Sequence, residues 1–168
     1  MKTSASIIKQ LFDITNDNHS SLNEKIQQVL LIGINRFKLD IAIFAHINQK
    51  TNSYRVENCI APKDIPIHIG DIFQLNNTYC SITYASENPI AIEHVNKNDQ
   101  FKHHPAYQAF KLESYLGIPI KTANQKYGTL NFSSHSPYPR NFIDADIDVL
   151  RLMAMWIENQ LINKSTII

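Results

Sequence analysis

The sequence predicts an α+β domain built from mostly antiparallel hairpins with helices on both sides. Apolar residues at both ends of the chain recur at helical spacing, whereas two pairs of segments in between alternate as strands do and are joined by short polar turns. The predicted order is helix, helix, two strands, helix, strand, helix, two strands, helix. Such an order suits an α+β sandwich rather than a parallel sheet.

Two helices open the chain. Apolar residues within positions 5–17 follow helical spacing. Ser20 or Ser21 then predicts a helix start, and Glu24 completes a capping box with Ser21. The second helix ends near Phe37. Its apolar positions are Leu22, Ile26, Val29, Leu30 and Gly33.

A hairpin follows the second helix. Residues 41–48 alternate between two sets of side chains, which predicts a strand with both faces partly covered. Residues 48–52 are a polar turn, and residues 53–60 return as the second strand.

The middle of the chain is divided into shorter elements. Prolines and a glycine interrupt residues 61–75 and leave short extended pieces near Ile67 and Ile72. The Asn-Asn-Thr run that begins residues 76–85 predicts a helix start, and the Asn-Pro pair at 88–89 stops that helix.

A short strand, a loop and a short helix come next. We expect the strand over residues 90–94, the loop over residues 96–102 and the helix over residues 104–112.

The last part of the chain predicts a second hairpin and a long helix. Residues 115–122 and 126–133 read as strands, and Asn124 between them can take a positive φ angle. Residues 134–140 contain two prolines and predict a loop. The final helix begins near Asp144, whose carboxylate suits the positive end of a helix.

The final helix also predicts an assembly. Its apolar stripe has coiled-coil-like spacing and consists of Ile147, Leu150, Ala154, Ile157 and Leu161. Further apolar residues widen the stripe beyond what the sheet needs, namely Val149, Met153 and Trp156. We therefore expect a homodimer through the first and last helices.

Length and charge limit the classes of function. The 168 residues, 43% of them hydrophobic, suit one domain. A net charge of +1 gives no electrostatic reason to expect a nucleic-acid partner. Neither a secretory signal nor a membrane-spanning segment is expected, so we predict a cytoplasmic protein with reduced thiols at Cys59 and Cys80.

Three segments carry a resemblance to a known family. The first is Asn-Thr-Tyr-Cys-Ser at 77–81, and the second is His-Pro-Ala-Tyr at 104–107 continuing through 111–120. The third is Tyr-Gly-Thr-Leu-Asn-Phe-Ser-Ser at 127–134, followed by Phe142 and by residues 151–157. Together they resemble the GAF domains attached to bacterial sensor histidine kinases and related signalling proteins, over about residues 5–163 of a single domain spanning 1–168.

The resemblance implies a six-stranded antiparallel sheet with a small-molecule pocket on one face and the first, second and last helices on the other. The strand at 126–133 supports this division independently, because its side chains alternate in character. One side carries Thr129, Asn131 and Ser133, and the other carries Gly128, Leu130 and Phe132.

We predict a cavity between the helix at 78–81, the segment at 104–107 and the strand that carries Asn131 and Ser133. Its polar groups need water, a ligand or side chains such as His104 and Tyr107 as partners. The predicted ligand-binding residues are Thr78, Tyr79, Cys80, Ser81, His104, Tyr107, Tyr115, Asn131 and Ser133. No catalytic residue, cofactor or metal is predicted.

Cys80 leaves two interpretations open. A cysteine at a helix start can form a stabilised thiolate, whereas a buried cysteine is a small apolar side chain. The first interpretation resembles the GAF-fold free methionine-(R)-sulfoxide reductases. Those enzymes carry another cysteine in the loop before the fifth strand, and residues 96–112 contain none.

Other site types fit less well. His103 and His104 are adjacent and point in different directions, which disfavours a metal site. His104 before Pro105 either caps the short helix or contacts a ligand. Residues 101–107 lack the cysteine by which bilin-binding GAF domains hold their chromophore. Pro105 and Ala106 stand where cyclic-nucleotide-binding GAF domains carry Asp-Glu.

Three functions therefore remain as hypotheses. The first is a non-catalytic sensory domain that binds a small molecule and acts on a signalling effector chain. The second is a methionine sulfoxide reductase that uses Cys80. The third is a dimerisation module with an empty pocket.

Overall fold

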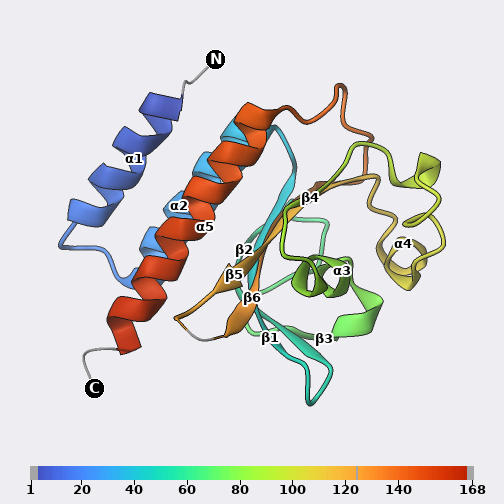
Figure 1. The fold of residues 1–168 in the computed structure, drawn as a ribbon, viewed down its shortest axis with the longest axis horizontal. Coiled ribbons are helices and arrows are strands. Elements are labelled where there is room, and N and C mark those ends of the chain that lie inside the picture. Colours follow the sequence, from blue (N-terminus) through green and yellow to red (C-terminus); the bar gives the residue numbers. More distant parts are fainter. Residues whose placement is uncertain (1–3, 124, 166–168) are drawn as a thin grey trace.

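A computed structural model describes residues 4–123 and 125–165 and shows one antiparallel sheet between two groups of helices (Figure 1). Six strands follow the order β3-β2-β1-β6-β5-β4, which confirms the predicted α+β, GAF-like class. The strands are β1 (Ile41–Asn48), β2 (Ser53–Ile60), β3 (Ile72–Gln74), β4 (Ile90–Ile92), β5 (Ser114–Lys121) and β6 (Lys126–Ser134). The helices are α1 (Ser4–Asn16), α2 (Leu22–Phe37), α3 (Cys80–Ala85), α4 (Pro105–Phe110) and α5 (Asp144–Ser165), with 3₁₀ turns η1 (Leu75–Asn77) and η2 (Val95–Lys97).

The sheet separates two hydrophobic cores. Helices α2 and α5 cover one face, and α3 and α4 lie on the other (Figure 1). Helix α1 packs on α2 and α5 as an outer element, where Trp156 Nε1 donates to Thr15 Oγ1 at 2.8 Å. The cavity described below lies in the core on the α3–α4 face.

The capping box predicted for the second helix is confirmed. Ser21 Oγ accepts from the Glu24 backbone N–H, and the Glu24 carboxylate accepts from the Ser21 backbone N–H. Lys38 ends α2 in the left-handed region with φ 58°, and its N–H donates to the Ile34 carbonyl. Both ends of α2 therefore satisfy main-chain groups that lie outside the helical hydrogen-bond ladder.

Both predicted hairpins are present. β1 pairs with β2 on one side and with β6 on the other, so β1 and β6 form the centre of the sheet. In the first turn, Asn48 Oδ1 accepts from the backbone N–H groups of Lys50 and Thr51, and Asn52 adopts φ 49°. The expectation for Asn124 concerns a position outside the described residues.

Two expectations about the middle of the chain were wrong. The helix expected over 76–85 begins at Cys80, because Thr78 is extended and its Oγ1 donates to the Leu75 carbonyl at 2.8 Å to close a 3₁₀ turn. The run that looked like a helix start is thus a separate turn. The loop expected over 96–102 also begins with part of a 3₁₀ turn, η2.

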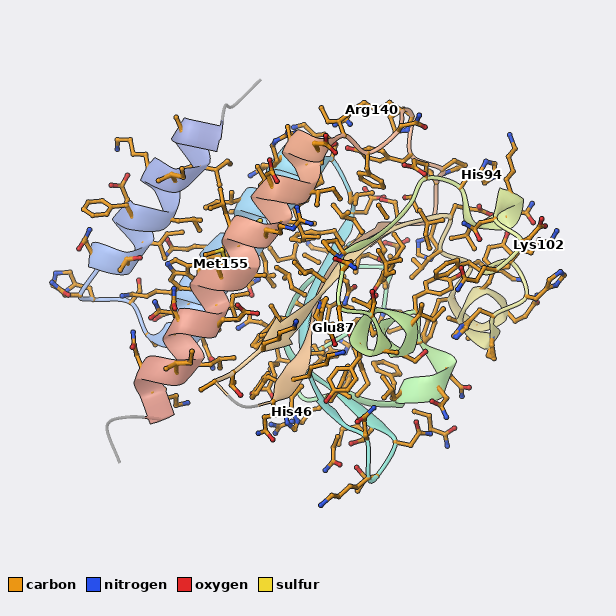
Figure 2. The ribbon with its side chains drawn as sticks, in the orientation of Figure 1. His46, Glu87, His94, Lys102, Arg140 and Met155 are labelled. Atoms are coloured by element: carbon orange, nitrogen blue, oxygen red, sulfur yellow. The ribbon has the colours of Figure 1, made fainter. Side chains whose placement is uncertain are left out.

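The expectation that the widened stripe on the last helix leaves apolar surface uncovered was wrong. Val149, Met153 and Trp156 are 1%, 0% and 8% exposed, because α5 packs against α1, α2 and strand β5. The exposed apolar residues of this region are others. Met155, labelled on α5 in Figure 2, is 56% exposed, and Phe12 on α1 is 66% exposed.

None of the helices within the described part of the chain is both long enough and apolar enough to cross a membrane.

Candidate functional site

A cavity of about 80 Å³ lies between the sheet and the segments that cover its α3–α4 face. Strands β1, β2, β5 and β6 contribute the side chains of Ile41, Ile43, Tyr54, Tyr115, Asn131 and Ser133. The cover and the rim contribute Ile65, Ile67, Phe73, Thr78, Tyr79, Cys80, Ala106, Phe110, Leu112 and His135. Most of these side chains are apolar or aromatic, so the cavity is less polar than the sequence suggested.

The structure brings six of the nine predicted site residues to this cavity and leaves three outside its lining. The six are Thr78, Tyr79, Cys80, Tyr115, Asn131 and Ser133. The three are Ser81 on α3, His104 at the start of α4 and Tyr107 on α4. A ligand role for any of the nine stays a prediction.

Sequence reasoning missed Tyr54, which lines the cavity and whose hydroxyl accepts a hydrogen bond from Asn131. The alternation of β2 places Tyr54 on the same face as Val56, and its register opposite Ile47 is set by the hairpin. The hairpin was predicted, so pairing its two strands residue by residue could have identified Tyr54. The segments with Ile65, Ile67 and Phe73 had no comparable signal.

A buried hydrogen-bond network forms the floor of the cavity. Asn131 Nδ2 donates to Tyr54 OH and to Cys80 Sγ, each at 3.3 Å. The Tyr115 hydroxyl lies 3.5 Å from Cys80 Sγ and 2.8 Å from Thr83 Oγ1. The partners that Asn131 meets are therefore Tyr54 and Cys80, whereas the sequence suggested His104 and Tyr107.

The thiol of Cys80 is held in its neutral form. Cys80 occupies the first turn of α3 but is only 4% exposed. Burial raises the pKa of this thiol, and hydrogen bonds from Tyr115 and neighbouring hydroxyls offset the effect only in part. A raised pKa disfavours the thiolate form, which is the form that a nucleophilic cysteine needs.

His104 is a helix cap. Its Nδ1 accepts from the Ala106 backbone N–H at 3.1 Å, and Pro105 occupies the first helical position of α4. Burial lowers the pKa of His104. The imidazole ring packs at a tilt against the ring of Tyr79, with centroids 5.6 Å apart. His104 therefore contacts a residue that lines the cavity without lining it itself.

Two buried hydroxyl groups near the cavity have no hydrogen-bond partner among the described residues. They are Tyr79 OH and Thr129 Oγ1. Thr129 is close enough to Cys80 to lower the pKa of its thiol, although the contact falls outside hydrogen-bond geometry. Tyr79 lines the cavity, and burial raises the pKa of its hydroxyl well above the ordinary value.

Within residues 4–123 and 125–165, no three His, Cys, Asp or Glu side chains come together in a way that could hold a metal ion. His103, the neighbour of His104, is exposed at the surface.

Comparisons with known proteins agree with this fold. Among solved structures, the GAF domain of an Acinetobacter phosphoenolpyruvate-protein phosphotransferase has a TM-score of 0.71 at 16% identity, covering 91% of this chain and 88% of its own. The phycocyanobilin-bound GAF domain of a cyanobacterial phytochrome has a TM-score of 0.73 at 13% identity, covering 92% and 93%. The free methionine-R-sulfoxide reductase of Neisseria meningitidis, in complex with its substrate, has a TM-score of 0.69 at 12% identity, covering 93% and 88%.

These identities are low, so the solved structures establish the fold and no activity. No curated protein matched the sequence. The family model described as GAF domain matches residues 7–161. The chain therefore belongs to the GAF domain family.

Proposed function

We propose that this chain is a non-catalytic sensory GAF domain, of the type attached to bacterial sensor histidine kinases, that binds a small molecule in the described cavity. The observation that carries the proposal is the position of β6. Asn131 reaches the cavity on one face, while the next residue, Phe132, is fully buried against the helices on the other. One strand thus joins a ligand site to the helical layer.

The helical side of this strand is tightly packed. The ring of Phe132 lies 5.0 Å from that of Phe37 in an edge-to-face arrangement. A Cβ atom added to Gly33 on α2 would lie 2.2 Å from Phe132 Cζ, so α2 and β6 are already in close contact. Because packed interiors resist compression, a displacement of β6 on ligand binding is expected to move α2 and α5. These helices, or a partner effector chain, would carry the signal.

The size of the cavity limits the ligand. Pockets for drug-sized molecules usually measure about 300–1,000 Å³, several times the 80 Å³ found here. The ligand is therefore either a molecule of few atoms or one that displaces the cover. Phe110 and Ile67 at the rim are only half-buried, so they are the residues best able to move.

Native mass spectrometry of freshly purified protein tests the proposal. We expect a retained small molecule that is lost on denaturation and that raises the melting temperature when it is added back. Asn131→Leu should lose the retained molecule, and the matched surface variant Asn96→Leu should keep it. A protein that carries no molecule and is stabilised by none would instead support a dimerisation module with an empty pocket.

A second candidate function rests on the position of Cys80, whose thiol lines the cavity. A methionine sulfoxide reductase would need this sulfur as a nucleophile. The raised pKa of Cys80 opposes that role, and we expect no turnover of free methionine sulfoxide with a thiol regenerating system. Multiple turnovers that disappear in Cys80→Ser and persist in Cys59→Ser would establish the enzyme instead.

A further inference from the structure

We propose that the cavity takes an uncharged aromatic molecule of about one ring that carries a hydroxyl or a similar hydrogen-bonding group. This inference rests on the proposed ligand-binding function and adds the chemical class of the ligand.

The charge of the lining excludes ionic ligands. Among the described residues that line the cavity there is no Lys, Arg, Asp or Glu, and the single histidine, His135, is exposed at the edge. A charged ligand group would leave water without gaining an opposite charge, which is strongly unfavourable in an apolar site. Amino acids, carboxylates and nucleotides are therefore poor ligands.

The shape of the lining favours a flat ring. Tyr54 and Phe73 have ring centroids 6.3 Å apart, and Phe110 meets Phe73 edge-on at 6.0 Å. Tyr79 and Tyr115 form another edge-to-face pair at 5.5 Å. A ligand ring among these five side chains can make the same offset and edge-to-face contacts with them.

The polar groups of the lining call for a hydrogen-bonding substituent. The hydroxyl of Tyr79 has no partner among the described residues, but it is enclosed near Tyr107 and Glu113 and does not open on the cavity. Asn131 uses its Nδ2 for Tyr54 and Cys80, and its Oδ1 accepts no hydrogen bond from any described residue. A ligand hydroxyl can donate to Asn131 Oδ1, which would satisfy an oxygen that is otherwise left unpaired.

The closed cavity is smaller than a single ring needs, so the rim side chains determine the size of the ligand. An engineered apolar cavity of about 150 Å³ accommodates benzene. The cavity here is about half that volume, so a single ring enters only when rim side chains such as Phe110 turn outward. A ligand with two or more fused rings would require the cover itself to open.

Titration calorimetry with phenol, benzene and benzoate at neutral pH tests the inference. We expect phenol to bind and benzoate to show no binding. We expect the affinity for benzene to be at least about fivefold lower than that for phenol. Asn131→Leu removes the acceptor and should reduce the affinity for phenol to that for benzene, with benzene unaffected. Tyr127→Phe removes a hydroxyl on the other face of the sheet and should change neither affinity.

Two results would overturn the inference. One is benzoate binding as tightly as phenol, and the other is no binding of any of the three probes. Neither touches the sensory function, because retention of a molecule is measured separately by native mass spectrometry. A retained ligand that proves ionic or multi-ring would leave the sensory function in place and refute this ligand class. If Asn131→Leu does not fold, the ratio of the phenol and benzene affinities in the wild-type protein still decides the role of the hydrogen bond.

Discussion

At the scale of single residues, Cys80 combines two opposing influences. Its place in the first turn of a helix favours a thiolate, whereas burial disfavours any charged form. Burial prevails, because a helix as short as α3 has only a small dipole to offset the loss of solvation. The same residue therefore accepts a hydrogen bond from Asn131 and acts as part of the cavity floor.

The rate of alkylation by iodoacetamide measures the reactivity of the Cys80 thiol directly. We predict that at pH 8 Cys80 reacts about an order of magnitude more slowly than Cys59, because reaction needs both a thiolate and local opening. Cys59 is half-exposed, although burial raises its pKa as well. Peptide mass mapping over time gives the two rates, with Cys59→Ser and Cys80→Ser as single-site controls. Equal rates in the folded protein would contradict the assignment, and equal rates in urea are expected.

At the scale of secondary-structure elements, the central strand pair depends on one close contact. A Cβ atom at Gly128 on β6 would lie 1.8 Å from the carbonyl oxygen of Ala45 on β1. The obstacle is main chain, so no side chain can turn away to make room. Glycine at this position lets the two strands approach at the point where β6 leaves its hairpin turn.

We predict that Gly128→Ala lowers the free energy of unfolding by about 2–3 kcal/mol, because β1 and β6 must separate to admit the methyl group. Urea denaturation followed by circular dichroism measures the change. Ala91→Gly, at an exposed position on the short strand β4, is the control and should cost about 0.5–1 kcal/mol. Equal effects of the two substitutions would show that the contact is less strict than the geometry indicates.

At the scale of the whole molecule, a buried charge cluster joins α2, α5 and the loop before α5. Asp146 is 0% exposed and pairs with Arg36 at 3.0 Å and with Arg140 at 2.6 Å. The backbone N–H of Ile143 donates to the same carboxylate at 3.1 Å. Burial raises the pKa of Asp146, but the hydrogen bonds and charges of the two arginines outweigh it and the net pKa is lowered.

We predict that Asp146→Asn costs about 3 kcal/mol at neutral pH, because the buried guanidinium group of Arg36 and the partly exposed one of Arg140 lose their counter-charge. A carboxylate with a lowered pKa stabilises the fold fully above its unfolded value, near 3.9, and loses that stabilisation as pH falls through the folded value. The difference from the wild type should therefore be constant from about pH 5 to 8 and shrink below about pH 4.

Chemical denaturation at several pH values provides the measurement for this prediction. Asp148→Asn is the matched control, since Asp148 is largely exposed and its pair with Arg151 is 3.5 Å long. That substitution should change stability by less than about 1 kcal/mol. A cost for Asp146→Asn that does not depend on pH would show that the carboxylate charge is not the source of the stabilisation.

Assembly also belongs to the whole molecule. We predict a homodimer through α1 and α5, where Ile8, Phe12 and Met155 are 53%, 66% and 56% exposed. Large apolar side chains on two adjacent helices form the kind of surface that proteins usually cover. Sedimentation at tens of micromolar should show a dimer. Phe12→Glu should give a folded monomer, while Ile72→Glu, on the edge strand β3, should remain dimeric; a monomeric wild type would refute the prediction.

Local chemistry made much of the architecture predictable. Helix α2 was located by its capping box and by the 3.6-residue spacing of its apolar face, both of which depend on residues within a few positions of one another. The alternation of β6 predicted which of its residues face the cavity and which face the helices, and the structure confirms this for Asn131 and Phe132. Side chains return to the same face every 2.0 residues in a strand and every 3.6 residues in a helix, and both repeats are properties of the backbone itself.

The composition of the site depends on the tertiary structure. Asn131 meets Tyr54 across 77 positions of sequence and Cys80 across 51, and nothing local to any of the three encodes these contacts. The cap formed by His104 is a local hydrogen bond to a residue two positions away, whereas the place of His104 outside the cavity lining was decided by how α4 packs. Hydrogen bonds within a turn are set by neighbouring residues, whereas the lining of a cavity is set by which distant segments exclude water from one another.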